Sequence, residues 1–250
     1  MNTKRLAAIA LLFALLFLAH WLSRNKWTEG PKPFVPGPEA MAFSMHLAAA
    51  SGDVRTLGHL LENGADINAR DQGGLTPLHG AARFGNLGAV RLLLSREGIE
   101  IDPKNSLGYT PLCMAMMFRY FDVARELIRR GADVNSKNRA GFTMLHGAVA
   151  LGRKDEAEIL LEASGIDVDA RSGSGLTPLH FAAQRSRMGI ARLLIAGGAD
   201  VNARASDGST PLIVAIKSLD IDMALLLMRS GADADYAQEW FNKGRRSVLV

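Results

Sequence analysis

Histidines recur along this chain at an almost constant spacing, and evenly spaced imidazoles could bind metal ions. Four of the six histidines fall one or two steps of 33 or 34 residues apart, namely His46, His79, His146 and His180. Cys113 occupies the missing step, and thiolates and imidazoles are both common metal ligands. The spacing alone is therefore consistent with two roles for these residues. They could form a row of metal ligands, or each could be a structural side chain that occurs once per repeated unit.

Cys113 is the single cysteine of this 250-residue chain. One cysteine excludes an intramolecular disulfide framework and a multi-cysteine zinc or iron–sulfur site. A redox role would require an exposed thiol with a lowered pKa. We therefore expect Cys113 to be a small buried side chain.

Other residue types that take part in catalysis are present without the spacing that catalysis requires. The glycine-rich stretches at 71–74 and 172–175 are not followed by the Lys-Ser/Thr of a phosphate-binding loop. No Ser–His–Asp order, H-E-x-x-H motif or paired acidic motif stands out. The net charge of +4 is too small to indicate nucleic-acid binding without a concentrated basic patch. We expect a protein that is not an enzyme, with no catalytic residue, metal, cofactor or nucleic-acid partner.

The elements that hold these residues are repeats. The tetrapeptide Thr76-Pro77-Leu78-His79 returns with its threonine at steps of 34, 33, 34 and 33 residues, and a degenerate copy runs from Phe43 to His46. A second marker, typified by Gly64-Ala65-Asp66-Ile67-Asn68, begins at glycines 64, 98, 131, 165, 198 and 231. Six markers at this period indicate six repeats.

The T-P-L-H and G-A-D-V-N signatures at this period resemble the ankyrin repeat family, over residues 37 to 236. The resemblance implies an all-α ankyrin-repeat solenoid of stacked helix pairs with β-hairpin-like loops. An N-terminal hydrophobic helix would precede this solenoid. The six repeats are expected at 39–69, 71–103, 105–136, 138–170, 172–203 and 205–236.

Local chemistry agrees with such a fold. A threonine caps free backbone N–H groups at the start of a helix, and proline suits the first helical position. Leu78, Ala81 and Ala82 then follow at helical spacing. One helix pair cannot bury its apolar face alone, so neighbouring repeats must stack.

The resemblance also implies roles for individual residues. In the family, the T-P-L-H histidine forms hydrogen bonds between loops of adjacent repeats, which favours the structural role over a metal ladder. Family ligands contact the hairpin tips and the ends of the first helices on the concave side. The matching candidate partner-binding residues are Leu75, Arg83, Phe84, Leu107, Tyr109, Met117, Phe118, Arg139, Phe142, Leu151, Gln184, Arg185 and Lys217. Aromatic residues with Met and Arg have the composition of a protein-binding hot spot. The alternative for Leu75, Tyr109 and Phe142 is packing between loops.

The amino-terminal residues 1–28 have the pattern of a targeting segment. A basic start precedes an apolar run from Leu6 to Ala19, as in a secretory signal. No small-x-small pair for cleavage ends the run. As a helix, residues 6–22 would be about 25 Å long, against roughly 30 Å for a bilayer core. We therefore expect a membrane anchor through residues 6–22, with a cleaved signal peptide as the alternative.

Two short segments flank the repeats. Residues 29–38 include four prolines between Gly30 and Pro38, which predicts a stiff extended linker. Residues 237–250 form a C-terminal tail in which Trp240 and Phe241 are expected to cap the last repeat. The basic residues of the tail offer an alternative role, contact with lipid or with an acidic protein.

Together these features predict a monomeric protein–protein interaction module or scaffold. It would be exported and tethered to a membrane, facing the periplasm if the source is a bacterium, and would bind another protein on its concave and hairpin face. The alternative is a soluble secreted or periplasmic inhibitor or protector of a specific enzyme.

Overall fold

The computed structural model describes residues 37–246 of the chain. The expected anchor at 1–28, with its apolar residues 6–22, and the linker up to residue 36 lie outside the described residues. The described residues from 38 to 246 form one compact unit. Within residues 37–246, no helix combines the length and the apolar character needed to cross a bilayer.

Thirteen helices follow one another in the described residues, and no strand is assigned there. Twelve of them form six pairs in chain order. The first helices of the pairs are α2 (Pro38–Ser51), α4 (Pro77–Arg83), α6 (Pro111–Met117), α8 (Met144–Leu151), α10 (Pro178–Gln184) and α12 (Pro211–Lys217). The second helices are α3 (Val54–Glu62), α5 (Leu87–Leu94), α7 (Phe121–Arg129), α9 (Lys154–Leu161), α11 (Met188–Ala196) and α13 (Ile221–Arg229). A final helix, α14, spans Ala234–Arg246.

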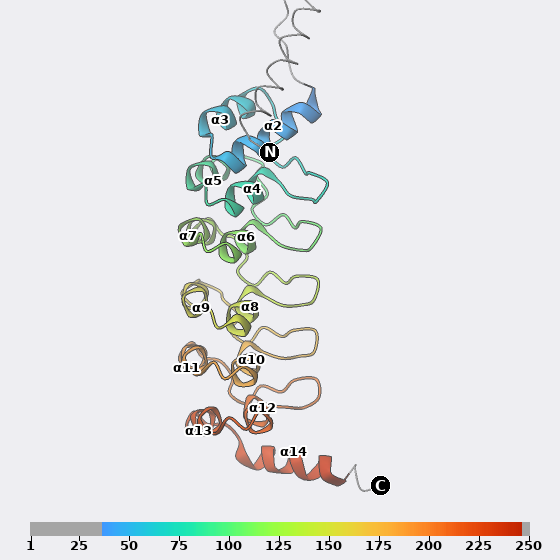
Figure 1. The fold of residues 1–250 in the computed structure, drawn as a ribbon, viewed down its shortest axis with the longest axis vertical. Coiled ribbons are helices and arrows are strands. Elements are labelled where there is room, and N and C mark those ends of the chain that lie inside the picture. The colour runs from blue at the N-terminus through green and yellow to red at the C-terminus, as the bar shows by residue number, and fades with distance from the viewer. Residues whose placement is uncertain (1–36, 247–250) are drawn as a thin grey trace, which may run out of the picture. The chain divides into compact units, whose positions relative to one another are not determined.

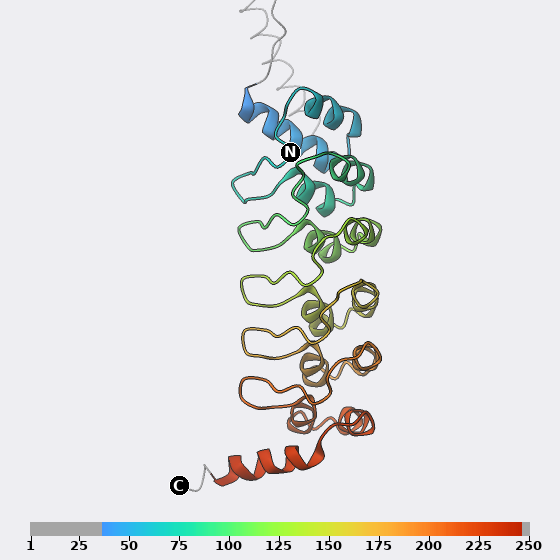
Figure 2. The same ribbon diagram turned by 180° about the vertical axis from the view of Figure 1, so that it is seen from behind.

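The pairs stack into a solenoid within residues 38–246. The first helices form one column, the second helices form a column beside it, and hairpin-like loops project from the side of the first column (Figure 1). The view from behind shows the same order of helices and loops (Figure 2). The fold is therefore the all-helical solenoid that the repeats predict.

Threonine precedes every first helix except α2, and proline begins every first helix except α8. The Oγ1 atom of Thr110 accepts a hydrogen bond from the backbone N–H of Cys113 at 3.3 Å, and Pro111 occupies the first turn. In α4, α8 and α10 the threonine and a histidine three residues later cap each other's backbone groups. The capping residue of each repeat thus sets where its first helix begins.

The core lies between and along the two helix columns. The leucine two residues after the threonine is fully or almost fully buried in all five copies that have one: Leu78, Leu112, Leu145, Leu179 and Leu212. Alanines at the next turn, such as Ala81 and Ala182, are also fully buried and let neighbouring first helices approach closely. Each repeat therefore buries its apolar residues against its neighbours rather than within itself.

The last residue of each G-A-D-V-N marker links its repeat to the next. The side chain of Asn68 donates to the carbonyl of Gly98 at 2.7 Å and accepts from the N–H of Glu100 at 3.0 Å. Asn135 and Asn202 form the same two bonds with the repeats that follow them. Because Asp102 can only accept, it keeps one of the two bonds, from the N–H of Asp133 at 2.9 Å.

The C-terminal helix differs from the expected tail at 237–250 because it begins three residues earlier, inside the last predicted repeat. The hydroxyl of Tyr236 donates to the carbonyl of Gly208 at 2.9 Å, and the indole N–H of Trp240 lies 3.4 Å from the carbonyl of Asp207. The Trp240 and Phe241 rings meet edge to face at 5.3 Å. These side chains attach α14 to the last hairpin loop. At the other end Pro38, expected in the linker, is the first residue of α2.

Candidate protein-binding surface

The repeated histidines use both ring nitrogens inside the protein. In His79, Nδ1 accepts from the N–H of Thr76 at 3.0 Å, and Nε2 donates to the carbonyl of Tyr109 in the next loop at 3.0 Å. His146 and His180 repeat this arrangement. Burial lowers the pKa of all three imidazoles, which keeps them neutral. Within residues 37–242, no group of three His, Cys, Asp or Glu side chains could hold a metal ion.

Cys113 fills the same position in the third repeat. Its thiol is buried, and the hydroxyl of Thr110 lies 3.4 Å from its sulfur. Burial raises the pKa of the thiol. The sulfur is therefore held protonated and covered, unlike a reactive thiolate.

The predicted partner-binding residues separate into two groups in the structure. Ten side chains are exposed: Arg83, Phe84, Leu107, Met117, Phe118, Arg139, Leu151, Gln184, Arg185 and Lys217. Leu75, Tyr109 and Phe142 are half-buried. Leu75 and Tyr109 pack against the core, and the ring of Phe142 meets those of His146 and Phe181 edge to face. The three half-buried side chains thus hold loops in place.

Eight of the exposed residues lie where a first helix turns into its second helix. We call this surface the ridge, and define it as residues 83–86, 117–120, 150–153, 184–187 and 217–220. Exposed apolar side chains dominate its first three segments, where Phe84 is 53%, Phe118 is 46% and Leu151 is 62% exposed. The guanidinium carbon of Arg83 lies 5.6 Å from the ring centroid of Phe84 and 5.4 Å from that of Phe118. This cation–π cluster joins the second and third repeats at the surface.

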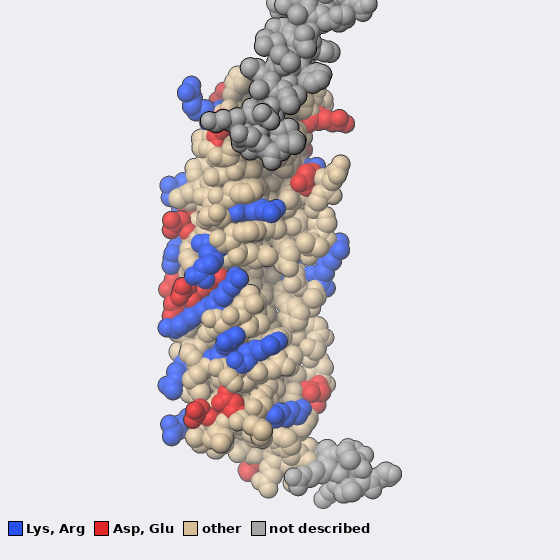
Figure 3. Space-filling model, in the orientation of Figure 1, with Lys and Arg blue, Asp and Glu red and all other residues tan. Residues whose placement is uncertain are grey.

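The ridge is also strongly basic. Its sequence contains six cationic residues, Arg83, Arg119, Arg153, Arg185, Arg187 and Lys217, against one acid, Asp220. Figure 3 shows Lys and Arg side chains spaced down the face that carries the two helix columns. A partner that docks here meets aromatic surface between positive charges.

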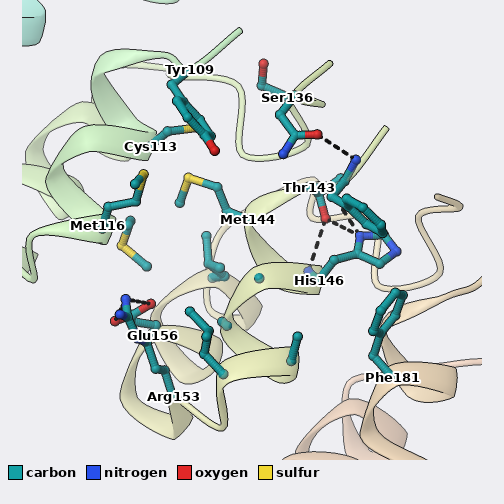
Figure 4. A pocket seen from close by; sticks show the side chains of 18 residues that line it. Tyr109, Cys113, Met116, Ser136, Thr143, Met144, His146, Arg153, Glu156 and Phe181 are labelled. Carbon is teal, nitrogen blue, oxygen red and sulfur yellow. Dashed lines mark hydrogen bonds and ion pairs between the residues drawn. The ribbon is translucent and has the colours of Figure 1, made fainter. Parts of the chain in front are cut away.

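A cavity of about 310 Å³ opens between the third and fourth repeats, and we call it the α6–α8 crevice. Its walls are mainly apolar and include Met116 and Met117 from α6, and Met144, Gly147 and Leu151 from α8. In Figure 4 the side chain of Met144 reaches toward Cys113 and Met116 on the opposite wall. The exposed residues Met117, Gly147 and Leu151 connect the crevice with the ridge.

Large side chains at two positions explain why the stack opens here. Met116 stands where the second and fifth repeats have the fully buried alanines Ala82 and Ala183. Met144 stands where the second, third, fifth and sixth repeats have the proline of their T-P-L-H copy. The two methionines face each other, and α6 and α8 approach less closely than other neighbouring first helices. Gly147, whose missing Cβ would meet no atom within 4 Å, leaves part of the space unfilled.

A buried carboxylate closes one end of the crevice. Glu156 of α9 is 5% exposed and lies 3.2 Å from Nη1 of Arg153 and 3.4 Å from Nη1 of Arg119. Burial raises the pKa of the Glu156 carboxyl, and the two arginines oppose that effect. Arg119, at φ 63°, also pairs with Asp155 at 3.1 Å. The two ion pairs of Arg119 hold the third and fourth repeats together beside the gap.

The sequence interpretation did not single out Met144, Glu156 or Arg119 as site residues. A signal for Met144 was present, because it interrupts the Thr-Pro pattern at the first helical position. Glu156 and Arg119 are charged residues near helix starts, and spacing alone gives such residues no special role.

The fold of the described residues defines the class to which this protein belongs. It is a helical repeat solenoid with a continuous exposed ridge, and such folds are typically non-catalytic scaffolds that bind other proteins. The family model described as "Ankyrin repeats (3 copies)" matches residues 45–138 and 145–238. The chain belongs to the ankyrin repeat family, and these repeats indicate a protein–protein interaction module.

Curated relatives share the repeats but are much longer proteins. The chain is 34% identical over 139 residues to neurogenic locus notch homolog protein 1 of Xenopus tropicalis, covering 56% of this chain and 6% of that protein. It is 34% identical over 157 residues to Rabankyrin-5 of Mus musculus, covering 61% of this chain and 13% of that protein. The chain thus spans a small part of these relatives.

Solved structures match over most of both chains. An ankyrin repeat domain from Acinetobacter baumannii AYE aligns with a TM-score of 0.68 and 31% identity, covering 76% of this chain and 99% of that one. The ankyrin repeat domain of Bcl-3 aligns with a TM-score of 0.69 and 28% identity, covering 74% of this chain and 81% of that one. A third match is a chain from the complex of the Bd0816 predatory endopeptidase of Bdellovibrio bacteriovorus with immunity protein Bd3460. It aligns with a TM-score of 0.62 and 33% identity, covering 74% of this chain and 97% of that one.

Proposed function

We propose that this protein binds a partner protein on its ridge, acting as a monomer. The observation that carries the proposal is the exposed cluster of Arg83, Phe84 and Phe118, in which a guanidinium lies between two aromatic rings. Exposed aromatic and arginine side chains contribute most of the binding energy in many interfaces. The stacked repeats hold this surface in place, so docking requires little ordering.

We further propose that the ankyrin repeats are exported and tethered to a membrane. The support is the basic start and the uninterrupted apolar run at residues 6–22, followed by the proline-rich linker. A tether would raise the local concentration of the repeats at the membrane, and the stiff linker would set their reach. Mass spectrometry of the mature amino terminus tests this part, since a mature chain without residues 1–22 would remove the tether.

Site-specific photo-crosslinking in the source cells tests the docking surface. A photoreactive phenylalanine analogue replaces Phe84 or Phe118 on the ridge. Matched control positions are Arg125 and Arg192, which are exposed on the second helices α7 and α11. We expect one discrete cross-linked protein from the ridge positions and none from the controls. Equal cross-linking at all four positions would contradict the proposal.

A second candidate function is inhibition or protection of a specific enzyme. The chain from the complex of an endopeptidase with an immunity protein, 33% identical over 74% of this chain, favours this candidate. In this second function, the ridge would cover the enzyme and keep it inactive until the enzyme is needed elsewhere. If the cross-linked protein is a hydrolase, its activity in the presence of the purified repeats decides between a docking scaffold, which leaves activity unchanged, and an inhibitor, which abolishes it.

A further inference from the structure

The α6–α8 crevice has the size of a site for one side chain. Its volume is about 310 Å³, at the lower limit of roughly 300 Å³ for ligand pockets. An apolar cavity of about 150 Å³ already holds a benzene molecule. The crevice can therefore accept a ring as large as an indole, and it is too small for a nucleotide or a larger cofactor.

The lining of the crevice favours an aromatic occupant. Met116, Met117 and Met144 all contribute to its walls. Thioethers make favourable contacts with the edges of aromatic rings, and methionine side chains adapt their shape to what binds. An aromatic ring would also cover the apolar parts of Leu151, which is otherwise 62% exposed.

The charges around the mouth of the crevice indicate what flanks that ring. Arg83 lies on the ridge before the crevice, and Arg185 and Lys217 lie beyond it. Arg119 and Arg153 are already paired with Asp155 and Glu156, whereas Arg83 and Arg185 form no ion pair within residues 37–242. Carboxylates of a partner would find these guanidinium groups available on either side.

We propose that the α6–α8 crevice binds one aromatic side chain of an acidic partner segment that lies along the ridge. This inference rests on the proposed function and specifies the partner's chemistry. The aromatic ring supplies the buried anchor, and acidic residues before and after it pair with Arg83 and Arg185. The segment crosses the junction where Met116 and Met144 separate the third and fourth repeats.

Labelled peptides test the inference with the full chain. The probes are short fluorescein-labelled peptides of Asp and Glu around one central residue, which is Trp in the first peptide and Ala in the second. Fluorescence anisotropy measures both dissociation constants. We expect the Ala peptide to bind about tenfold or more weakly. Equal binding of both peptides, or no binding of either, would overturn the inference.

A substitution that fills the crevice tests its location. Gly147→Trp adds an indole from a helical position that lines the crevice and has no atom within 4 Å of its missing Cβ. Gly189→Trp is the matched control on α11, where the missing Cβ also meets nothing within 4 Å. We expect Gly147→Trp to raise the dissociation constant of the Trp peptide about tenfold or more, and Gly189→Trp to leave that constant unchanged. Gly147→Ala should retain binding, which separates filling from a loss of folding.

Two further results distinguish this inference from the proposed function. Suppose that the Trp and Ala peptides bind the unmodified chain alike and that Arg83→Glu lowers the affinity for both. The ridge then docks acidic protein, and only the crevice inference fails. If free indole displaces the Trp peptide and binds with the same affinity as that peptide, the crevice is a small-molecule site and the assignment to a partner segment is wrong. Photo-crosslinking at Phe84 and Phe118 decides the proposed function independently.

Discussion

Arg119 of the third repeat and Glu156 of the fourth repeat form an ion pair across the junction that contains the crevice, with Nη1 3.4 Å from Oε1. The carboxylate is buried, whereas the guanidinium is half exposed at 50%. Because the first helices α6 and α8 are held apart by methionines, this pair and the pair of Arg119 with Asp155 supply part of the cohesion that close alanine packing gives elsewhere. Ion pairs therefore support this junction, together with the hydrogen bonds of Asn135 to Gly165 and Asp167.

Arg119→Gln should weaken this junction locally. The variant leaves the buried carboxylate of Glu156 paired with Arg153 alone and also removes the exposed pair with Asp155, so we expect a loss of about 1 kcal/mol in the free energy of unfolding. Hydrogen exchange should speed up in α8 and α9 more than in α4 and α5. Glu158→Gln is the control, because Glu158 pairs with Lys154 at 3.2 Å on the exposed surface. Equal effects of the two variants would contradict the role of the buried pair.

The buried histidines should make stability depend on pH near neutrality. The pKa values of His79, His146 and His180 are lowered in the fold by burial, while the unfolded chain keeps values of about 6.5. As pH falls through 6.5, the unfolded state therefore takes up protons that the folded state does not. Stability should decrease from pH 7.5 to pH 5.5 in urea unfolding.

His180→Gln isolates this effect, because glutamine can keep the capping bond to the N–H of Thr177 without titrating. We expect a smaller pH slope in this variant than in the unmodified chain. An unchanged slope in His180→Gln would show that this histidine does not cause the pH dependence.

Asp102→Asn should stabilise the protein at pH 7. The Oδ1 atom of Asp102 is buried and has no hydrogen-bond partner among residues 37–242, and burial raises the pKa of the carboxyl. A raised pKa means that stability is lost as pH rises through the folded value, and asparagine removes that loss. Its amide could also donate as Asn68 does to Gly98. We expect a gain of about 1 kcal/mol that shrinks as pH falls toward 4.

Asp169→Asn provides the comparison for this prediction. Both carboxylate oxygens of Asp169 lie within hydrogen-bond distance of the N–H of Asp200, at 3.0 and 3.1 Å. Since neither oxygen is left without a partner, the gain from asparagine should be smaller than at Asp102. A larger gain at Asp169 would show that the orphaned oxygen is not the cause.

The repeated features of this protein were predictable because each is fixed by local chemistry. Thr76, Pro77 and His79 determine a helix start and a loop contact within a few residues, and the same letters recur once per repeat. The crevice was not predictable in this way. It depends on Met116 of one repeat facing Met144 of the next, and spacing cannot show which side chains meet across an interface between repeats.

The candidate binding residues also divide into those whose exposure follows from the sequence and those whose exposure depends on contacts between repeats. Exposure of Phe84 and Phe118 follows from their place at the end of a first helix, where the chain turns. Tyr109 and Phe142 lie at hairpin positions with equally aromatic side chains, yet neighbouring loops cover them in part. Whether an aromatic residue packs or protrudes thus depends on the side chains that surround it in space.

The most direct test of the central claim is the affinity of the purified cross-linked partner for a ridge variant. In Phe84→Ala/Phe118→Ala both exposed rings are removed, while Arg125→Ala/Arg192→Ala removes two exposed side chains from the second helices. Calorimetric titration should give a dissociation constant about tenfold or more higher for the ridge variant, and an unchanged one for the control. An unchanged dissociation constant in the ridge variant, with its fold intact, would contradict the assignment of this surface.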